Sequence, residues 1–156
     1  MALAGDGSSG PYLHQPLVTA LTNFYRTLSD LSYITPSDII SPSSQTGMHV
    51  TEAIDSSRAQ STGYNSTVID LMYHLPYLSE EASDIQLASN TTKLSYLRQS
   101  DDEDGVFEDA RDLFQGRRTV PSHMLVLTWG QVYGTFVVYD VQTGNCFSFS
   151  FKLLLC

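Results

Sequence analysis

The stretch from Val126 to Leu155 constrains the fold most, because it contains three short runs rich in β-branched and aromatic residues. The runs are 126–129, 133–139 and 146–151, and each is short enough for a single strand. Gly130-Gln131 separates the first two runs and Thr143-Gly144-Asn145 separates the last two, and both separators are typical of compact turns. The pattern predicts an antiparallel meander at this end of the chain.

Two segments before the meander have apolar residues at helical spacing. The first predicted helix runs from about Pro16 to Tyr33, and the second begins after Asn65, a strong N-cap, and stops at Pro76. The apolar face predicted for the first helix consists of Leu17, Leu21, Phe24, Leu28 and Leu31. Helices first and strands last indicate an α+β fold, with N-terminal helices packed on one face of a mainly antiparallel sheet formed by the C-terminal half.

Weaker patterns predict four further elements. They are a short helix from His49 to Gln60, a strand from Lys93 to Leu97, a helical turn from Val106 to Phe114, and a loop at 35–44 anchored by Ile39-Ile40. The 156 residues are near the usual size of one domain. We expect a flexible N-terminal tail at 1–12 and a single α+β domain at 13–156.

Charge is unevenly distributed along the chain, whose net charge is −9. Seven of the 17 carboxylates lie within 101–112, which predicts a solvated acidic loop at about 100–118. Because the chain has no basic stripe, nucleic acid and anionic membranes are excluded as expected partners. A protein partner with a basic surface is compatible with this charge.

The sequence also favours a cytoplasmic, intracellular location. It has no basic, apolar leader of the secretory type and no apolar run approaching the ~20 residues of a membrane span. Cys146 and Cys156 are too few for a disulfide framework, and Cys146, inside a predicted strand, is expected to be a small buried hydrophobe.

Motifs for catalysis, metal binding or nucleotide binding are not found. With Gly105 as the central glycine of a calcium loop, the first and twelfth ligand positions fall on Ser100 and Arg111, which are wrong ligands. The four histidines lack zinc-type spacing. We therefore expect no catalytic residue, no cofactor and no metal site, and the sequence favours a protein that is not an enzyme.

Two groups of residues are candidates for binding. The candidates for a binding site are His74, Tyr77, Trp129, Tyr133, Tyr139 and Asp140. The candidates for contact with a partner or a second copy are Phe147, Phe149, Phe151 and Leu154. A structural role is the simpler explanation for two of them, since His74 can complement the end of a helix and Asp140 can cap a turn.

Three blocks of sequence carry a resemblance to known families. They are His14-Gln15-Pro16-Leu17 through Leu28, Gly63-Tyr64 through His74-Leu75-Pro76-Tyr77-Leu78, and Leu127-Thr128-Trp129-Gly130 with Val138-Tyr139-Asp140 and Thr143-Gly144. Together they resemble small uncharacterised proteins of filamentous fungi. More distantly, the closing strand, turn and strand is similar to the SUKH superfamily, which includes a yeast cell-wall assembly regulator and bacterial toxin-immunity proteins. This similarity implies a non-catalytic α+β binding module and transfers no catalytic residue.

Three functions are compatible with these observations. The first is an intracellular protein-interaction or regulatory module, as the resemblance implies. The second is a small-molecule binding protein or enzyme with an aromatic-lined pocket between helices and sheet, since the chain has nine Tyr, seven Phe and one Trp. The third is a self-associating structural protein, a homodimer for example, in which the Phe residues of the last strand and the apolar tail form the contact.

Overall fold

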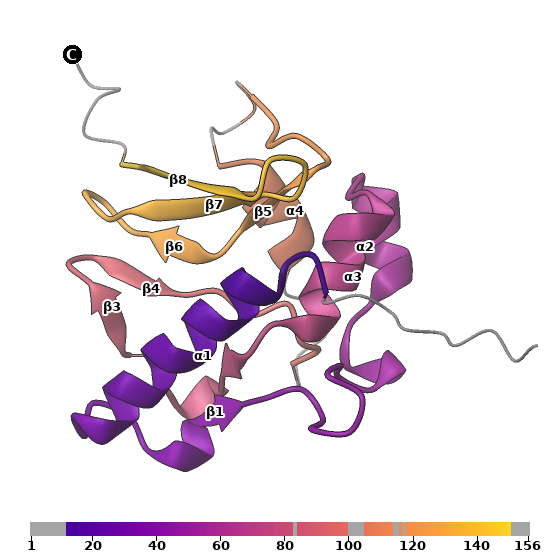
Figure 1. Cartoon of the computed structure of the whole chain (residues 1–156). Coiled ribbons are helices and arrows are strands. Elements are labelled where there is room, and N and C mark those ends of the chain that lie inside the picture. Colours follow the sequence, from indigo (N-terminus) through magenta and orange to yellow (C-terminus); the bar gives the residue numbers. More distant parts are fainter. Residues whose placement is uncertain (1–11, 83, 100–104, 114–115, 117, 151–156) are drawn as a thin grey trace, which may run out of the picture.

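The computed structural model describes residues 12–82, 84–99, 105–113, 116 and 118–150 (Figure 1). The first half contains α1 (Gln15–Asp30), η1 (Pro36–Asp38), β1 (Ile39–Ile40), η2 (Thr51–Ala53), α2 (Ser56–Thr62), α3 (Ser66–His74) and β2 (Tyr77–Leu78), where η denotes a 3-10 helix. The second half contains η3 (Glu80–Ala82), β3 (Gln86–Ala88), β4 (Thr91–Lys93), α4 (Val106–Arg111), β5 (Met124–Val126), β6 (Thr128–Gly130), β7 (Phe136–Asp140) and β8 (Asn145–Phe149). N-terminal helices and C-terminal antiparallel sheets confirm the predicted α+β class.

The strands form two three-stranded sheets in the orders β5-β7-β8 and β3-β4-β6, besides the β1-β2 pair. Leu127 alone separates β5 from β6, so one extended segment pairs first with β7 and then with β4. Thr128 lies where the segment changes its pairing partner from β7 to β4. Its Oγ1 donates to Thr135 O at 3.0 Å and accepts from the Val137 N–H at 2.9 Å, which keeps it bonded to the chain that leads into β7. The first strand of the predicted meander therefore serves both sheets.

Helix α3 forms as the sequence predicts. The Asn65 side chain accepts a hydrogen bond from the Val68 N–H at 2.9 Å, which satisfies one of the free donors at the start of the helix. Leu71 and Met72 are fully buried, and Pro76 follows the last turn. This helix is at the centre of the main hydrophobic core, which also includes residues of α2, α4, β5 and β7.

Helix α1 differs from its prediction in length and in part of its apolar face. It ends at Asp30 rather than Tyr33, because Ser32 has a φ of 62° and this left-handed conformation cannot continue a helix. Phe24 is 40% exposed, whereas Tyr25 is buried in a smaller core cluster beneath the helix. Leu17, Leu21 and Leu28 pack against the core clusters as predicted, whereas Phe24 and the still more exposed Leu31 face away from them.

The predicted helix at 49–60 is wrong, since two separate helices occupy this stretch. Asp55 lies between η2 and α2, and its carboxylate accepts a hydrogen bond from the Arg58 N–H at 2.9 Å. This N-cap starts a new helix instead of continuing an old one. The predicted loop at 35–44 also contains structure, because β1 pairs with β2 through Ile39 and Leu78.

The predicted strand from Lys93 to Leu97 is displaced, since β4 spans Thr91–Lys93 and residues 94–97 belong to no strand. Tyr96 is buried and donates its hydroxyl to Val126 O at 2.8 Å, which directs this segment into the core rather than along a sheet. Cys146 is exposed, contrary to the prediction, because β8 is the outer strand of its sheet among the described residues. The predicted turn at 106–114 becomes α4, with Phe114 outside the described residues.

Candidate binding cavity

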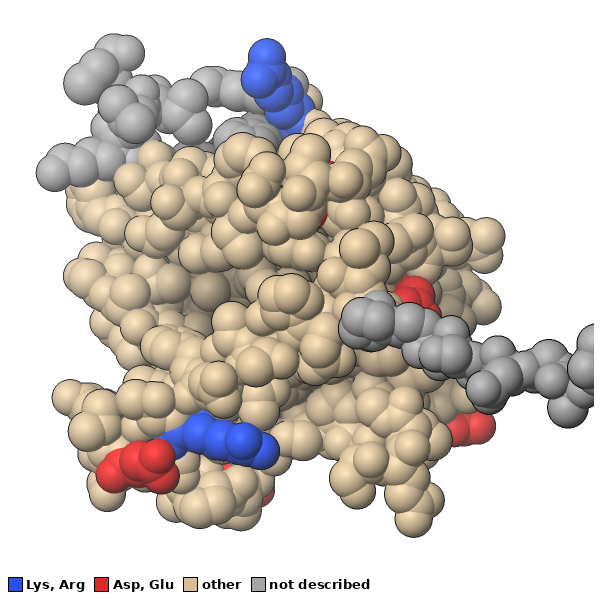
Figure 2. Space-filling view, in the orientation of Figure 1, with Lys and Arg blue, Asp and Glu red and all other residues tan. Residues whose placement is uncertain are grey.

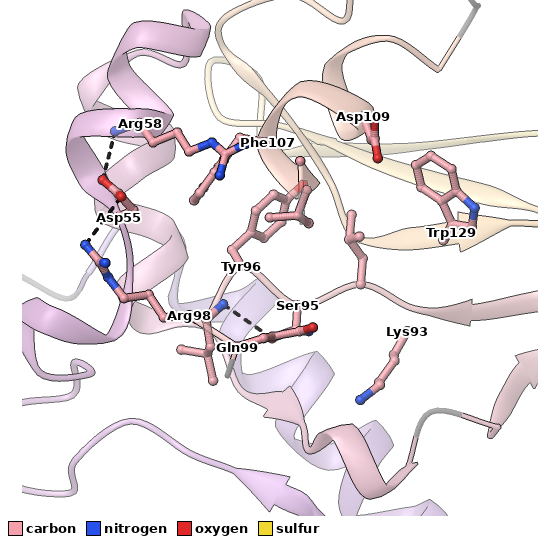
Figure 3. A pocket seen from close by; sticks show the side chains of 14 residues that line it. Asp55, Arg58, Lys93, Ser95, Tyr96, Arg98, Gln99, Phe107, Asp109 and Trp129 are labelled. Atoms are coloured by element: carbon pink, nitrogen blue, oxygen red, sulfur yellow. Dashed lines mark hydrogen bonds and ion pairs between the residues drawn. The ribbon is translucent and has the colours of Figure 1, made fainter. Parts of the chain in front are cut away.

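A cavity of about 480 Å³ lies between α2, the segment that follows β4, α4 and β6 (Figure 3). Its volume falls within the range of roughly 300–1,000 Å³ that is usual for small-molecule sites. Its walls include the side chains of Arg58, Tyr96, Arg98, Phe107 and Trp129. Segments far apart in the chain therefore meet around one space.

Aromatic rings form the apolar part of the wall. Tyr96 and Phe107 are buried with ring centroids 5.8 Å apart. Because the Tyr96 hydroxyl is already hydrogen-bonded to Val126 O, Tyr96 offers the cavity mainly its ring. Burial raises the pKa of that phenol well above its usual value, so it stays neutral. Trp129 is half-buried, and its ring meets Phe136 edge to face at 5.5 Å.

Three charged side chains, Asp55, Arg58 and Arg98, lie at the opposite end of the cavity from Trp129, and Asp109 lies near Trp129 (Figure 3). Arg58 Nε donates to Glu108 Oε1 at 3.0 Å. Burial would raise the pKa of Glu108, but the hydrogen bond from Arg58 opposes this effect and the pKa lies below its usual value. Arg98 Nη2 lies 3.4 Å from Asp55 Oδ2, which makes a looser ion pair between half-exposed side chains.

Lys93 also lines the cavity, but its ammonium group is occupied elsewhere. It donates to the carbonyl oxygens of Leu78, at 3.2 Å, and Ser79. Burial lowers the pKa of Lys93, while the carboxylates of Glu80 and Asp38 oppose that effect. In Figure 3 this side chain points away from Trp129. Lys93 thus joins β4 to β2 and contributes positive charge near the cavity.

The structure places the sequence-predicted residues at separate positions, and Trp129 alone among them lines the cavity. His74 ends α3, where its Nδ1 donates to Gly47 O at 2.8 Å and its ring stacks on Tyr12 at 4.0 Å. Tyr77 is buried and donates to Met72 O at 2.7 Å. Both side chains therefore hold neighbouring backbone in place, a structural role.

Tyr139 connects β7 to the N-terminal segment. A hydrogen bond of 2.9 Å joins its Oη to His14 Nδ1, and His14 is only 3% exposed. The His14 Nε2 atom has no hydrogen-bond partner among the described residues. Burial lowers the pKa of His14, which favours the neutral ring. Tyr12 completes the attachment by donating to Asp70 Oδ2 at 3.0 Å.

Tyr133 and Asp140 lie in turns. Tyr133 is 62% exposed in the turn between β6 and β7 and has a φ of 67°, a strained value for a bulky residue. The Asp140 carboxylate accepts from the Gln142 N–H at 2.8 Å and from Thr143 Oγ1 at 3.0 Å. These bonds match the turn-capping role expected for Asp140.

The aromatic residues predicted to contact a partner differ in exposure. Phe147 is 48% exposed on β8, whereas Phe149 is partly buried and stacks on Phe136 at 5.5 Å. Phe151 and Leu154 lie outside the described residues. Phe147 is therefore the member of this group that is open to a partner in the described part of the chain.

Sequence reasoning missed most of the cavity, including Arg58, Arg98 and Tyr96. One signal was available, because the chain has only eight Lys and Arg residues and three of them line this space. Their proximity could not be read from spacing, since Arg58 comes from α2 and Arg98 from a segment without regular structure. Tyr96 falls in the predicted strand at 93–97, whereas the structure buries its side chain in the core at the wall of the cavity.

The described residues lack two further features. No group of three or more His, Cys, Asp or Glu side chains there could hold a metal ion. Likewise, none of the described helices is both long and apolar enough to cross a membrane.

No protein-family model matches the chain, and neither a curated protein nor a solved structure matches it. The resemblances to fungal proteins and to the SUKH superfamily thus remain predictions. A function has to be inferred from the cavity itself.

Proposed function

We propose that this protein is a non-catalytic binding protein that holds a small organic molecule in the cavity beside Trp129. The observation that supports this proposal is the cavity of about 480 Å³ with an aromatic wall and a charged end. Apolar walls supply most of the affinity of such sites, and a few charged groups orient the ligand. This is the small-molecule alternative among the functions that the sequence allows.

The residues around the cavity favour binding over catalysis. Its described lining contains no histidine or cysteine, so it offers no Ser-His or Cys-His pair for nucleophilic catalysis. Ser95 contributes an aliphatic hydroxyl to the lining, and its Oγ accepts a hydrogen bond from the Leu97 N–H at 3.3 Å. That contact stabilises the local backbone and does not activate the hydroxyl.

A ligand screen tests this proposal. A compound present at 100 times its dissociation constant stabilises the folded protein by about 2.7 kcal/mol, which a thermal-shift assay detects. Trp129 is the single tryptophan of the chain, so its fluorescence reports on the cavity directly. A hit should shift both signals. No stabilisation by any member of a broad metabolite library, with unchanged Trp129 emission, would refute the proposal.

Self-association is a second candidate function, and the exposed strand β8 favours it. Within the described residues β8 is the outer strand of its sheet, and none of Asn145–Phe149 is charged. Natural proteins commonly protect such edges with charged side chains. We expect wild type to sediment as a dimer and Phe147→Lys as a monomer. Monomeric wild type at the highest soluble concentration would contradict this candidate.

The role in protein interaction expected from the sequence stays a prediction. On the face shown in Figure 2, uncharged side chains dominate and the described basic residues form no stripe. Residues 101–104, which carry much of the acidic stretch proposed to meet a basic partner, lie outside the described residues.

A further inference from the structure

We propose that residues 12–14 form a pH-sensitive latch, in which neutral His14 holds this segment against β7 and α3 and protonated His14 releases it. The latch lies apart from the proposed ligand site, because the described lining of the cavity includes none of the residues that fasten it, namely Tyr12, His14, Asp70, His74 and Tyr139. Release of the latch would uncover Tyr139, which is now only 5% exposed.

Three side-chain contacts fasten the latch to the rest of the fold. Tyr12 donates to Asp70 Oδ2 at 3.0 Å, and its ring stacks on that of His74 with the centroids 4.0 Å apart. Both partners belong to α3. His14 makes the third contact, through the 2.9 Å hydrogen bond between its Nδ1 and Tyr139 Oη on β7. His14 is therefore the residue that joins the latch to the sheet.

The surroundings of the His14 ring suit its neutral form. The residue is 3% exposed, and its Nε2 has no hydrogen-bond partner among the described residues. Protonation turns both ring nitrogens into donors, so the cation would carry a buried N–H without an acceptor. A buried polar group that lacks a partner is costly, and water can solvate it once the latch is released. Burial thus favours the docked latch only while His14 is neutral.

Charges near the ring add to this effect. The titratable groups that face His14 are Tyr12 of the latch, Asp70 and His74 of α3, and Tyr139 of β7, with Asp140 and Cys146 next to Tyr139. His14 is the N-cap of α1, where the helix dipole disfavours a cation. Burial has the largest effect and lowers the pKa of His14; Asp70 opposes this shift and His74 adds to it.

The latch should open as the pH falls. In the released segment His14 is solvated and its pKa is near the ordinary value of 6.5, whereas in the docked latch the pKa is lower. Below pH 6.5 the released form therefore binds more protons than the docked form. The equilibrium constant for release should rise by up to about tenfold per pH unit until the pH passes the lowered pKa. Above pH 6.5 the ring is neutral in both forms and the latch stays docked.

Amide hydrogen exchange of the full chain, followed by NMR, tests the latch. The reporters are three N–H groups that donate to backbone oxygens of the latch, those of Gln15, Leu17 and Val18. The reference is the Ile69 N–H, which is bonded within α3. Between pH 7.5 and pH 5.0, with intrinsic exchange rates corrected for, protection of the reporters should fall about tenfold relative to Ile69.

Two variants identify the group that controls release. His14→Asn keeps a polar atom near the position of Nδ1 but does not titrate, so reporter protection should become independent of pH. His49→Gln is the matched control. His49 is another histidine whose pKa burial lowers, but its Nε2 is bonded to Leu75 O rather than to the latch. This control should keep the wild-type fall in protection.

Several outcomes would overturn the latch. Unchanged reporter protection at pH 5.0 excludes release, and a fall that persists in folded His14→Asn assigns it to another group. An equal fall at Ile69 shows acid unfolding of the whole domain instead of local release. If His14→Asn does not fold, the wild-type ring signals decide the matter. The His14 ring and the reporter amides should then titrate together, and a ring that becomes charged while the reporters stay protected refutes the latch.

Discussion

Replacing Arg111 with methionine should destabilise the protein by about 3 kcal/mol. This side chain joins three segments, since its Nε and Nη2 donate to Val120 O at 3.1 and 2.8 Å and its Nη1 donates to Thr62 O at 2.5 Å. Its guanidinium also lies 5.4 Å from the centroid of the Tyr64 ring. The end of α2, helix α4 and the approach to β5 are therefore held by one residue.

The magnitude follows from these contacts. Hydrogen bonds to a charged donor contribute about 1.5–3 kcal/mol each, and a buried carbonyl left without its donor carries a further penalty. The two bonds to Val120 O share one acceptor and cannot be counted fully. Because Arg111 is only partly buried, water can solvate some of the released carbonyls. The cation–π contact with Tyr64 adds about 0.5–1 kcal/mol, while methionine retains the packing of the apolar stem.

Equilibrium unfolding in urea measures the effect, with the shift in midpoint interpreted at unchanged slope. Arg111→Lys keeps the charge but cannot reach both carbonyls, so it should fall between wild type and Arg111→Met. Arg26→Met, at an exposed position of α1, should change stability by less than about 0.5 kcal/mol. A loss below about 1 kcal/mol for Arg111→Met would show that solvent replaces these hydrogen bonds and that our reasoning is wrong.

Two further predictions concern acid and a tight turn. Burial lowers the pKa of His14 and His49 from 6.5, so the unfolded chain binds more protons below that pH. Stability should fall as pH drops from about 6.5 toward the lowered pKa values, by up to about 1.4 kcal/mol per pH unit for each histidine, and urea midpoints should show a shallower fall for His14→Gln. Gly134→Ala should cost more than about 3 kcal/mol or prevent folding, because a Cβ there would lie 1.8 Å from Asn90 O. Urea unfolding measures this loss, and Gly47→Ala is the control: Gly47 has a φ of +69° and a Cβ there would meet no atom within 4 Å, so this variant should lose only about 1 kcal/mol.

The sequence by itself determined the elements that depend on neighbouring residues. Asn65 and Pro76 bound α3 because capping and the missing proline N–H act within one helical turn. The sequence predicts Asp140 as a turn residue for the same reason, since the two groups that donate hydrogen bonds to its carboxylate lie within three positions of it. The order of these local elements was sufficient to predict the α+β class.

Only the tertiary structure decided where the longer-range contacts form. Thr128 lets one segment serve two sheets, and Tyr96 leaves its predicted strand because a buried hydroxyl needs an acceptor, which Val126 O provides 30 residues away. The cavity exists for a related reason: α2, α4 and β6 pack around Tyr96 and bring Arg58 and Arg98 to one end. Hydrophobic periodicity records which face of a segment is buried, but it does not record which distant segment covers that face.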